Sequence, residues 1–271
     1  MRKHFFILLI VCFSLSVKTF AQSKNQEPFS FNKPFHALGF SVFNGINFAP
    51  KLQEYSGDIK PVLYSAYVPE FILQYNCMIK NGFGVALEVP FGIFHRQSET
   101  PLSDYGASND VLLEMGSPYI GFTAKLTVLQ EINKNICMQG ELGLKFHPFY
   151  YSADRWYNQN YYELVSSSED RFYFEDNSSI NFSVIEQKYY AIPDATGGLL
   201  FFFHSQKNPK SNLVLGVTVN LSFVERIKVI YDTSFSELIE NPDNPYYSWG
   251  RYGWNSTAVG ITVGYRFFGV K

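Results

Sequence analysis

The clearest pattern in this chain is a strict alternation of side-chain types over Thr257–Phe268. The large, apolar positions are Val259, Ile261, Val263, Tyr265 and Phe267. The positions between them are small apart from one charged residue, and they are Ala258, Gly260, Thr262, Gly264 and Arg266. A repeat of two residues predicts a β-strand. A strand with a large apolar face and a small polar face is typical of a barrel with lipid outside and a crowded polar lumen inside.

The same alternation recurs along the chain and predicts eight strands. They are expected at Ala37–Phe48, in a stretch that ends near Ile79, and at Phe83–Ile93, Val111–Leu129, Met138–Phe146, Tyr189–His204, Leu213–Phe223 and Thr257–Phe268. Three connections are short and rich in turn residues, namely Lys80–Gly82, Asn133–Asn135 and Ser205–Lys210. The other four connections are long loops, at about 49–63, 97–110, 150–186 and 232–254. Short turns that alternate with long loops give a barrel two different rims, as in outer-membrane barrels.

On this architecture, Ala37–Phe268 resembles the small eight-stranded outer-membrane β-barrel proteins of Gram-negative bacteria, of the OmpA transmembrane-domain type. The resemblance implies an all-β fold, an eight-stranded antiparallel up-and-down transmembrane β-barrel with short periplasmic turns and long extracellular loops. It rests on the strand pattern and not on a sequence motif. Members of that family usually end on an aromatic residue, whereas here Phe268 is followed by Gly269–Lys271.

The alternative fold is a soluble eight-stranded calyx of the lipocalin type. Such a calyx would turn the apolar face of each strand inward and expose the other face to water. That other face consists mostly of Gly, Ala, Ser and Thr, whereas a solvated face should carry many more charges. The pattern therefore favours the membrane barrel.

The N-terminus predicts export from the cytoplasm. Met1–Ala21 has the basic start, the apolar run and the small-residue cleavage site of a secretory signal peptide. Residues 22–36 are then a polar periplasmic tail, and residues 37–268 form the barrel. The formal net charge of −2 gives no sign of a nucleic-acid partner. We therefore expect the mature protein in the cell outer membrane, in contact with outer-membrane lipid and lipopolysaccharide.

Seven charged residues fall on the inward-facing positions of the predicted strands. They are Glu70, Glu88, Lys125, Glu141, Lys145, Asp194 and Arg266. Unpaired charge in a narrow lumen is costly, so an ion-pair network that fills the lumen is favoured over a proton or ion path. We expect Lys125 and Lys145 at similar depth with Glu88 and Glu141 between them. Arg266 should lie near the periplasmic rim, within reach of Glu70 or of a carboxylate on the rim.

The four histidines outside the signal peptide give no sign of a catalytic motif. His36, His95, His147 and His204 belong to no recognisable nucleophile or metal motif, and His147, which precedes Pro148, is expected at a rim. We therefore expect no catalytic residues, no metal, no cofactor and no enzyme activity. The alternatives are a lipid A-modifying enzyme, a narrow porin-like conduit or a secretion-accessory barrel. An eight-stranded barrel is just wide enough for side chains to fill it, which disfavours an open pore.

The third and fourth long loops are rich in aromatic residues. The candidate recognition surface comprises Trp156, Tyr157, Tyr161, Tyr162, Tyr246, Tyr247, Trp249, Tyr252 and Trp254. Tyr and Trp among small polar residues make good contact surfaces, although such rings also pack loops together. These loops therefore predict a structural or interaction role, with an extracellular protein, peptide or glycan as a possible ligand.

Overall fold

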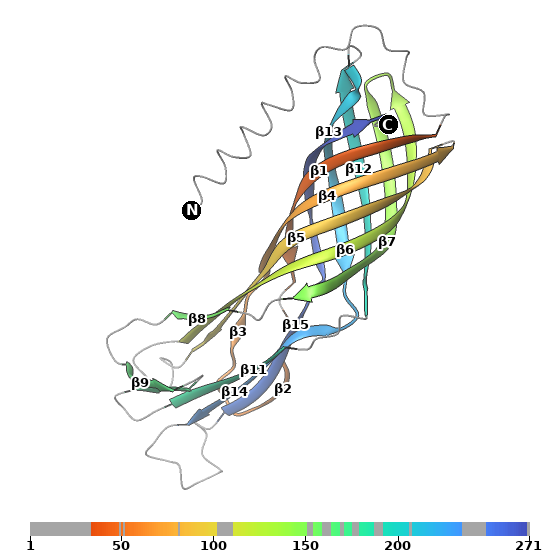
Figure 1. Cartoon of the computed structure of the whole chain (residues 1–271). Coiled ribbons are helices and arrows are strands. Elements are labelled where there is room, and N and C mark those ends of the chain that lie inside the picture. The colour runs from red at the N-terminus through yellow and green to blue at the C-terminus, as the bar shows by residue number, and fades with distance from the viewer. Residues whose placement is uncertain are drawn as a thin grey trace.

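Figure 1 shows the chain as a computed structural model, in which a β-barrel carries a second sheet at one end. The structure describes residues 34–48, 50, 52–80, 82–101, 111–150, 154–158, 164–168, 171–174, 179–186, 192–205, 208–234 and 248–269. The predicted signal peptide and all but the last three residues of the predicted tail lie outside these ranges. Within the described ranges there is no helix long and apolar enough to cross a membrane.

Eight antiparallel strands form the barrel. They are β1 (Phe35–Asn47), β4 (Ala66–Lys80), β5 (Phe83–Thr100), β6 (Val111–Asn133), β7 (Ile136–Tyr150), β12 (Asp194–Ser205), β13 (Asn208–Leu221) and β16 (Ala258–Phe268). Each pairs with the barrel strand before it and the barrel strand after it. The first and last strands also pair, from Ala37 opposite Phe268 to Asn47 opposite Ala258. This pairing closes the wall, so the predicted eight-stranded up-and-down barrel is confirmed.

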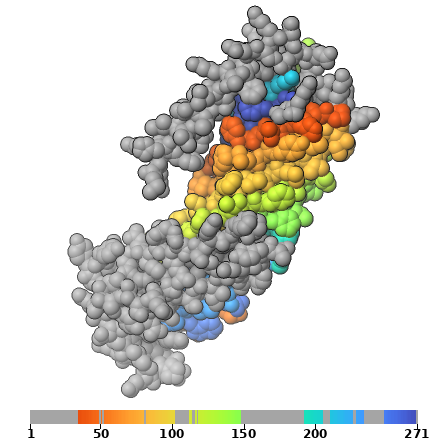
Figure 2. Space-filling model, viewed as in Figure 1, coloured from red at the N-terminus to blue at the C-terminus, as the bar shows by residue number. Residues whose placement is uncertain are grey.

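The two faces of the barrel strands follow the alternation in the sequence. Large apolar side chains point outward and are exposed, among them Leu38, Leu73, Leu87, Ile93, Phe122, Leu126, Leu142, Leu199, Leu213, Val217, Ile261 and Val263. In Figure 2 the outer surfaces of β1, β4, β5 and β6 lie side by side as a continuous wall. The positions between them point inward, and Thr123, Gln139 and Arg266 are examples that are almost fully buried. The barrel therefore has an apolar exterior and a largely polar centre.

The barrel has two unlike ends. The short connections lie at one end, here called the turn end, where β1 begins and β16 finishes (Figure 1). The β4–β5 hairpin turns there through Gly82, which adopts a positive φ of 78°. A Cβ at this position would collide with the carbonyl oxygen of Leu129, so both backbone angle and space require glycine.

The long connections differ from the loops that the sequence predicts. Their described parts contain β2 (Leu52–Ser56), β3 (Val62–Leu63), β8 (Asp154–Asn158), β9 (Leu164–Ser168), β10 (Arg171–Phe174), β11 (Ser179–Glu186), β14 (Glu225–Ser234) and β15 (Ser248–Asn255). Strand β5 also continues to Thr100, past the predicted start of its loop at Gln97. The prediction of long irregular loops is therefore wrong over these parts. Long connections leave many backbone groups to satisfy, and strand pairing satisfies them.

Six of these strands form a second sheet, here called the distal sheet, in the order β2-β15-β14-β11-β10-β9. It lies at the end of the barrel opposite the turns, beside the extended ends of β5 and β6 (Figure 1). The Ser98 hydroxyl on β5 is 2.8 Å from the Tyr252 hydroxyl on β15. This contact joins the extended end of β5 to the distal sheet. Ile59, between β2 and β3, is fully buried; its N–H donates to Ser248 Oγ, and its carbonyl accepts from Tyr231, both at 3.0 Å. A few residues later Val62 and Leu63 pair with β5, so this segment links the distal sheet to the extended end of β5.

Candidate functional site in the barrel lumen and the distal sheet

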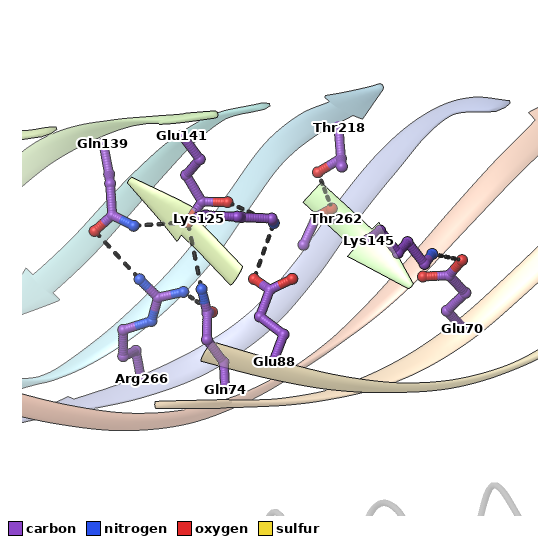
Figure 3. A network of polar contacts seen from close by, with 10 residues as sticks. All are labelled: Glu70, Gln74, Glu88, Lys125, Gln139, Glu141, Lys145, Thr218, Thr262 and Arg266. Atoms are coloured by element: carbon purple, nitrogen blue, oxygen red, sulfur yellow. Dashed lines mark hydrogen bonds and ion pairs between the residues drawn. The ribbon is translucent and has the colours of Figure 1, made fainter. Parts of the chain in front are cut away.

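The centre of the lumen holds a cluster built around Lys125 (Figure 3). Its ammonium group lies 2.9 Å from Glu88 Oε1 on β5 and 2.8 Å from Glu141 Oε2 on β7. Glu88 is opposite Thr123 on one side of β6, and Glu141 is opposite Thr127 on the other. Each carboxylate is thus a diagonal neighbour of Lys125, within reach of its long side chain. All three side chains are buried, so the pairing compensates charges that water does not reach.

Arg266 completes this central cluster through amides and not through a carboxylate. Its Nη1 donates to Gln139 Oε1 at 3.3 Å, and its Nη2 donates to Gln74 Oε1. The NH₂ groups of the same two amides donate to Glu141 Oε1, at 2.6 Å from Gln139 and 3.3 Å from Gln74. The amides therefore bridge the guanidinium and the carboxylate. With two cations and two anions, the cluster is neutral. The expectation that Arg266 pairs with Glu70 or with a carboxylate on the rim is wrong.

Two further contacts hold the Arg266 guanidinium. Asn76 accepts a hydrogen bond from Nη1 at 2.7 Å when its side-chain amide is oriented with the oxygen toward Arg266. The guanidinium also lies 4.6 Å from the centre of the Phe202 ring. An arginine suits this position because its planar group can donate several hydrogen bonds and stack on a ring at the same time.

Lys145 forms a second, separate pair with Glu70. Tyr119 donates its hydroxyl to the same Glu70 oxygen, and the Lys145 ammonium lies 5.5 Å from the centre of the Tyr119 ring. The strand register places Lys125 opposite Gly143 and Lys145 opposite Thr123. Lys145 is therefore about 7 Å nearer the distal sheet than Lys125. The expectation that Glu88 and Glu141 serve both lysines is wrong for Lys145.

Asp194 pairs with a histidine. Its Oδ2 lies 2.8 Å from His147 Nε2 and also accepts a hydrogen bond from the Ser256 hydroxyl. The His147 ring packs edge-on against Tyr119, with ring centres 5.0 Å apart, and all four side chains are buried. His147 lies three residues from the end of β7 and its partner Asp194 begins β12, which agrees with the expected place at a rim, but the ring points into the lumen and is buried. The shared carboxylate links β7 and β12 to Ser256, just before β16.

Apolar clusters lie on both sides of these polar groups. The first, toward the turn end, comprises Phe35, Ala37, Met78, Leu129, Cys137, Leu200, Phe202, Val214 and Phe268. The second, toward the distal sheet, comprises Phe43, Val68, Ile72, Phe94, Tyr119 and Ala258. Inward-facing Phe35, Phe202 and Phe268 are the signal in the sequence that could have predicted the first cluster. From the turn end toward the distal sheet, an apolar layer, a polar layer and an aromatic layer therefore fill the lumen.

The aromatic residues predicted as a recognition surface separate into three groups. Tyr252 and Trp254 are 0% exposed, with rings in edge-on contact at 5.1 Å, so for these two the expectation is wrong. Trp249 is 39% exposed on the outer face of β15. The side chains of the remaining residues lie outside the described part of the chain: Trp156, Tyr157, Tyr161, Tyr162, Tyr246 and Tyr247. On β15, alternation decides which rings are core and which are surface.

The described part of the chain has no cluster of three or more His, Cys, Asp or Glu residues positioned to hold a metal ion. The buried carboxylates and the histidine of the lumen instead have protein partners, as given above.

Comparisons with known proteins give only a distant similarity of shape. No protein-family model matches the sequence, and no curated protein matches it. One similar solved structure is the outer membrane protein OprG from Pseudomonas aeruginosa, with 12% identity and a TM-score of 0.49 over 88% of this chain and 97% of that chain. Another is Ail, the attachment invasion locus protein of Yersinia pestis, in complex with the heparin analogue sucrose octasulfate. Ail has 13% identity and a TM-score of 0.31, over 87% of this chain and 99% of that chain. At this level of similarity, the function of neither protein transfers to this chain.

Proposed function

We propose that this chain is an integral outer-membrane β-barrel with a filled lumen, whose distal sheet serves a structural or interaction role outside the cell. The observation that carries the proposal is the inversion of the barrel surfaces. Large apolar side chains cover the outside of the closed wall, while the charged residues Glu88, Lys125 and Arg266 are buried inside it. A water-soluble calyx requires the opposite arrangement.

The height of the apolar surface fits a membrane. On β5 the outward apolar positions extend from Phe83 to Ile93. Ten steps of about 3.4 Å make about 34 Å along the strand, and a strand tilt of about 40° reduces this to about 26 Å along the barrel axis. The outward apolar band of outer-membrane barrels is about 25 Å tall. In the proposed location, this band contacts outer-membrane lipid and lipopolysaccharide.

The proposed orientation places the turn end in the periplasm and the distal sheet outside the cell. Short turns and the ends of β1 and β16 lie at the first of these ends, and the long connections lie at the second (Figure 1). In outer-membrane barrels the short turns are periplasmic and the long connections extracellular. An extracellular protein, peptide or glycan could then reach the distal sheet.

The packed lumen supports a closed barrel over a conduit or porin-like channel. Phe35, Phe202 and Phe268 pack together at the turn end, with ring centres of Phe202 and Phe268 5.6 Å apart. Above them, the neutral cluster of Lys125 and Arg266 crosses the lumen from β6 to β16. We therefore propose that the barrel conducts no ions in the state described here.

We also propose that the protein is not an enzyme. In the described part of the lumen, the grouping of Ser256, His147 and Asp194 lacks the order that nucleophilic catalysis needs. In a serine–histidine–aspartate arrangement the histidine accepts the proton of the serine, whereas here Ser256 donates its hydroxyl to Asp194, the carboxylate that His147 also contacts. These side chains are also buried, which fits a structural link between strands.

Membrane fractionation and heat-modifiable migration on SDS gels test the proposed location. We expect the protein in the outer-membrane fraction, soluble only with detergent, with unboiled and boiled samples migrating differently. Recovery of folded protein from the periplasm without detergent would contradict the proposal. Protease added to intact cells should cut the distal sheet and leave the barrel.

Two further measurements separate the alternative functions. Lipid A incubated with the reconstituted protein should keep its mass, and a specific loss of an acyl chain that disappears in His147→Ala would establish an enzyme. Planar bilayers that contain the protein should show no stable conductance. A large, steady single-channel current would instead establish a conduit.

A further inference from the structure

The outer face of the distal sheet carries an exposed tryptophan among polar groups. Trp249 and Arg251 lie on the outer face of β15, while Tyr252 and Trp254 of the same strand are buried on its inner face. Two exposed neighbours on one face of a strand lie about 7 Å apart. Burial of a large aromatic side chain is strongly favourable. An exposed tryptophan beside charged groups is therefore a candidate contact residue for a ligand.

The neighbours of Trp249 come from three strands. The ladder places Asp232 of β14 opposite Trp249 on one side and Ser56 of β2 opposite it on the other. Arg251 Nε donates to Gln53 Oε1 at 2.9 Å, and its Nη2 lies 3.4 Å from Glu54 Oε1.

The polar row continues toward the barrel. Gln53 donates its amide to Glu225 Oε1, and the Glu225 carboxyl lies over the space where Gly253 has no side chain. Glu54, Arg251, Gln53 and Glu225 thus form one connected row that starts on the same face as Trp249. Each side chain contacts the next, so the row presents hydrogen-bond donors and acceptors side by side.

The chemistry of this face fits a sugar. A pyranose ring has an apolar C–H face that can stack on the electron-rich face of an indole ring. Its hydroxyl groups both donate and accept hydrogen bonds, and the row, which begins at Arg251 about 7 Å along the strand from Trp249, offers a guanidinium, an amide and carboxylates. One aromatic platform beside a few polar groups can therefore hold a sugar by stacking and by hydrogen bonds.

The charges favour an uncharged sugar over a polyanion. Among the side chains that the structure describes on this face, the acidic Glu54, Glu225 and Asp232 outnumber the basic Arg251 and Lys228. These acidic groups would repel a sulfated or phosphorylated sugar chain, whereas they would not repel an uncharged one.

We propose that the outer face of the distal sheet around Trp249 binds uncharged oligosaccharides, by stacking a sugar ring on Trp249 and by hydrogen bonds from the row that contains Arg251. This inference rests on the proposed function, because the face can meet extracellular glycans only if the distal sheet lies outside the cell. Binding itself does not depend on that location, so it can be measured on the purified full chain in detergent.

Isothermal titration with chitotetraose and with cellotetraose tests the inference. We expect at least one probe to bind the wild-type protein with a Kd between roughly 10 μM and 5 mM. Trp249→Ala should weaken that binding at least tenfold, Arg251→Ala should weaken it severalfold, and Trp249→Tyr should retain most of it. The matched control is Tyr64→Ala, which removes an exposed ring outside the distal sheet, between β3 and β4, and should leave binding unchanged.

Several results would overturn the inference. One is the absence of binding of both probes to folded wild-type protein at the highest concentration. Another is equal affinity of the wild type and Trp249→Ala, when heat-modifiable migration of the barrel and protease resistance of the distal sheet show that both are folded. Tighter, salt-sensitive binding of sucrose octasulfate at the same tryptophan would replace the neutral sugar by a polyanion. Fractionation tests the location separately, so either conclusion can fail while the other holds.

Discussion

Replacing Lys125 by methionine should destabilise the barrel strongly while preserving the volume of the side chain. The central cluster contains two cations, Lys125 and Arg266, and two anions, Glu88 and Glu141. The substitution leaves both carboxylates buried with a single cation, which reaches Glu141 only through amides. Removal of one partner from a buried ion pair typically costs about 3–5 kcal/mol, because the remaining charge is left uncompensated. We expect the free energy of unfolding of Lys125→Met to fall by that amount.

The assay is urea unfolding of the barrel refolded in detergent or lipid vesicles, followed by far-UV circular dichroism and by migration on unboiled SDS gels. Leu126→Met is the matched control, because it makes the same replacement at the next position, where the side chain is 69% exposed on the outer wall. That change conserves volume and should cost less than about 1.5 kcal/mol. The double variant Lys125→Met/Glu88→Gln removes one charge of each sign and restores neutrality. It should therefore recover much of the loss.

Two results would refute this reasoning. If Lys125→Met unfolds at the same urea concentration as Leu126→Met, Lys125 does not lie between two buried carboxylates. If the loss of stability in the double variant is as large as the sum of the losses in the two single variants, Glu88 is not coupled to Lys125 through charge.

Four further changes test other parts of the structure. Glu70→Gln removes the charge that Lys145 pairs with and should lower the free energy of unfolding by about 3 kcal/mol in the same urea assay, whereas no change would contradict the second ion pair. Ile59→Ala empties a fully buried position and should cost about 2–5 kcal/mol locally, seen as faster proteolysis of the distal sheet with unchanged heat-modifiable migration of the barrel. Gly82→Ala forces a side chain into a positive φ and should cost at least about 1–2 kcal/mol by urea unfolding, unless the hairpin adopts another turn. Burial raises the pKa of Tyr231 above its ordinary value of 10, so the distal sheet should lose stability as the pH rises above 10, and Tyr231→Phe should suppress that loss in protease-resistance measurements.

Much of the barrel could be predicted from the sequence alone. The two-residue period of Leu213–Leu221 and Ala258–Phe268 assigns every side chain of these strands to the outer or the inner face, because a strand has only two faces. The turn residues around Gly82 and Asn133–Asn135 set the hairpins and therefore the neighbouring strands. The same alternation predicts that Lys125, Glu141 and Arg266 all face the interior, and this prediction does not require the register between strands.

Other features depend on the tertiary structure. Depth along the lumen depends on the register between strands, which is why Lys145 meets Glu70 and why Arg266 meets amides contributed by β4 and β7. The distal sheet is assembled from segments distant in sequence, so its pairing has no local period to predict it. Tyr252 and Trp249 are similar rings on one strand, and only the layer that packs against one face of that strand makes the first core and the second surface. Local alternation can assign a side chain to a face, but what covers that face is decided by contacts between parts of the chain that are far apart in sequence.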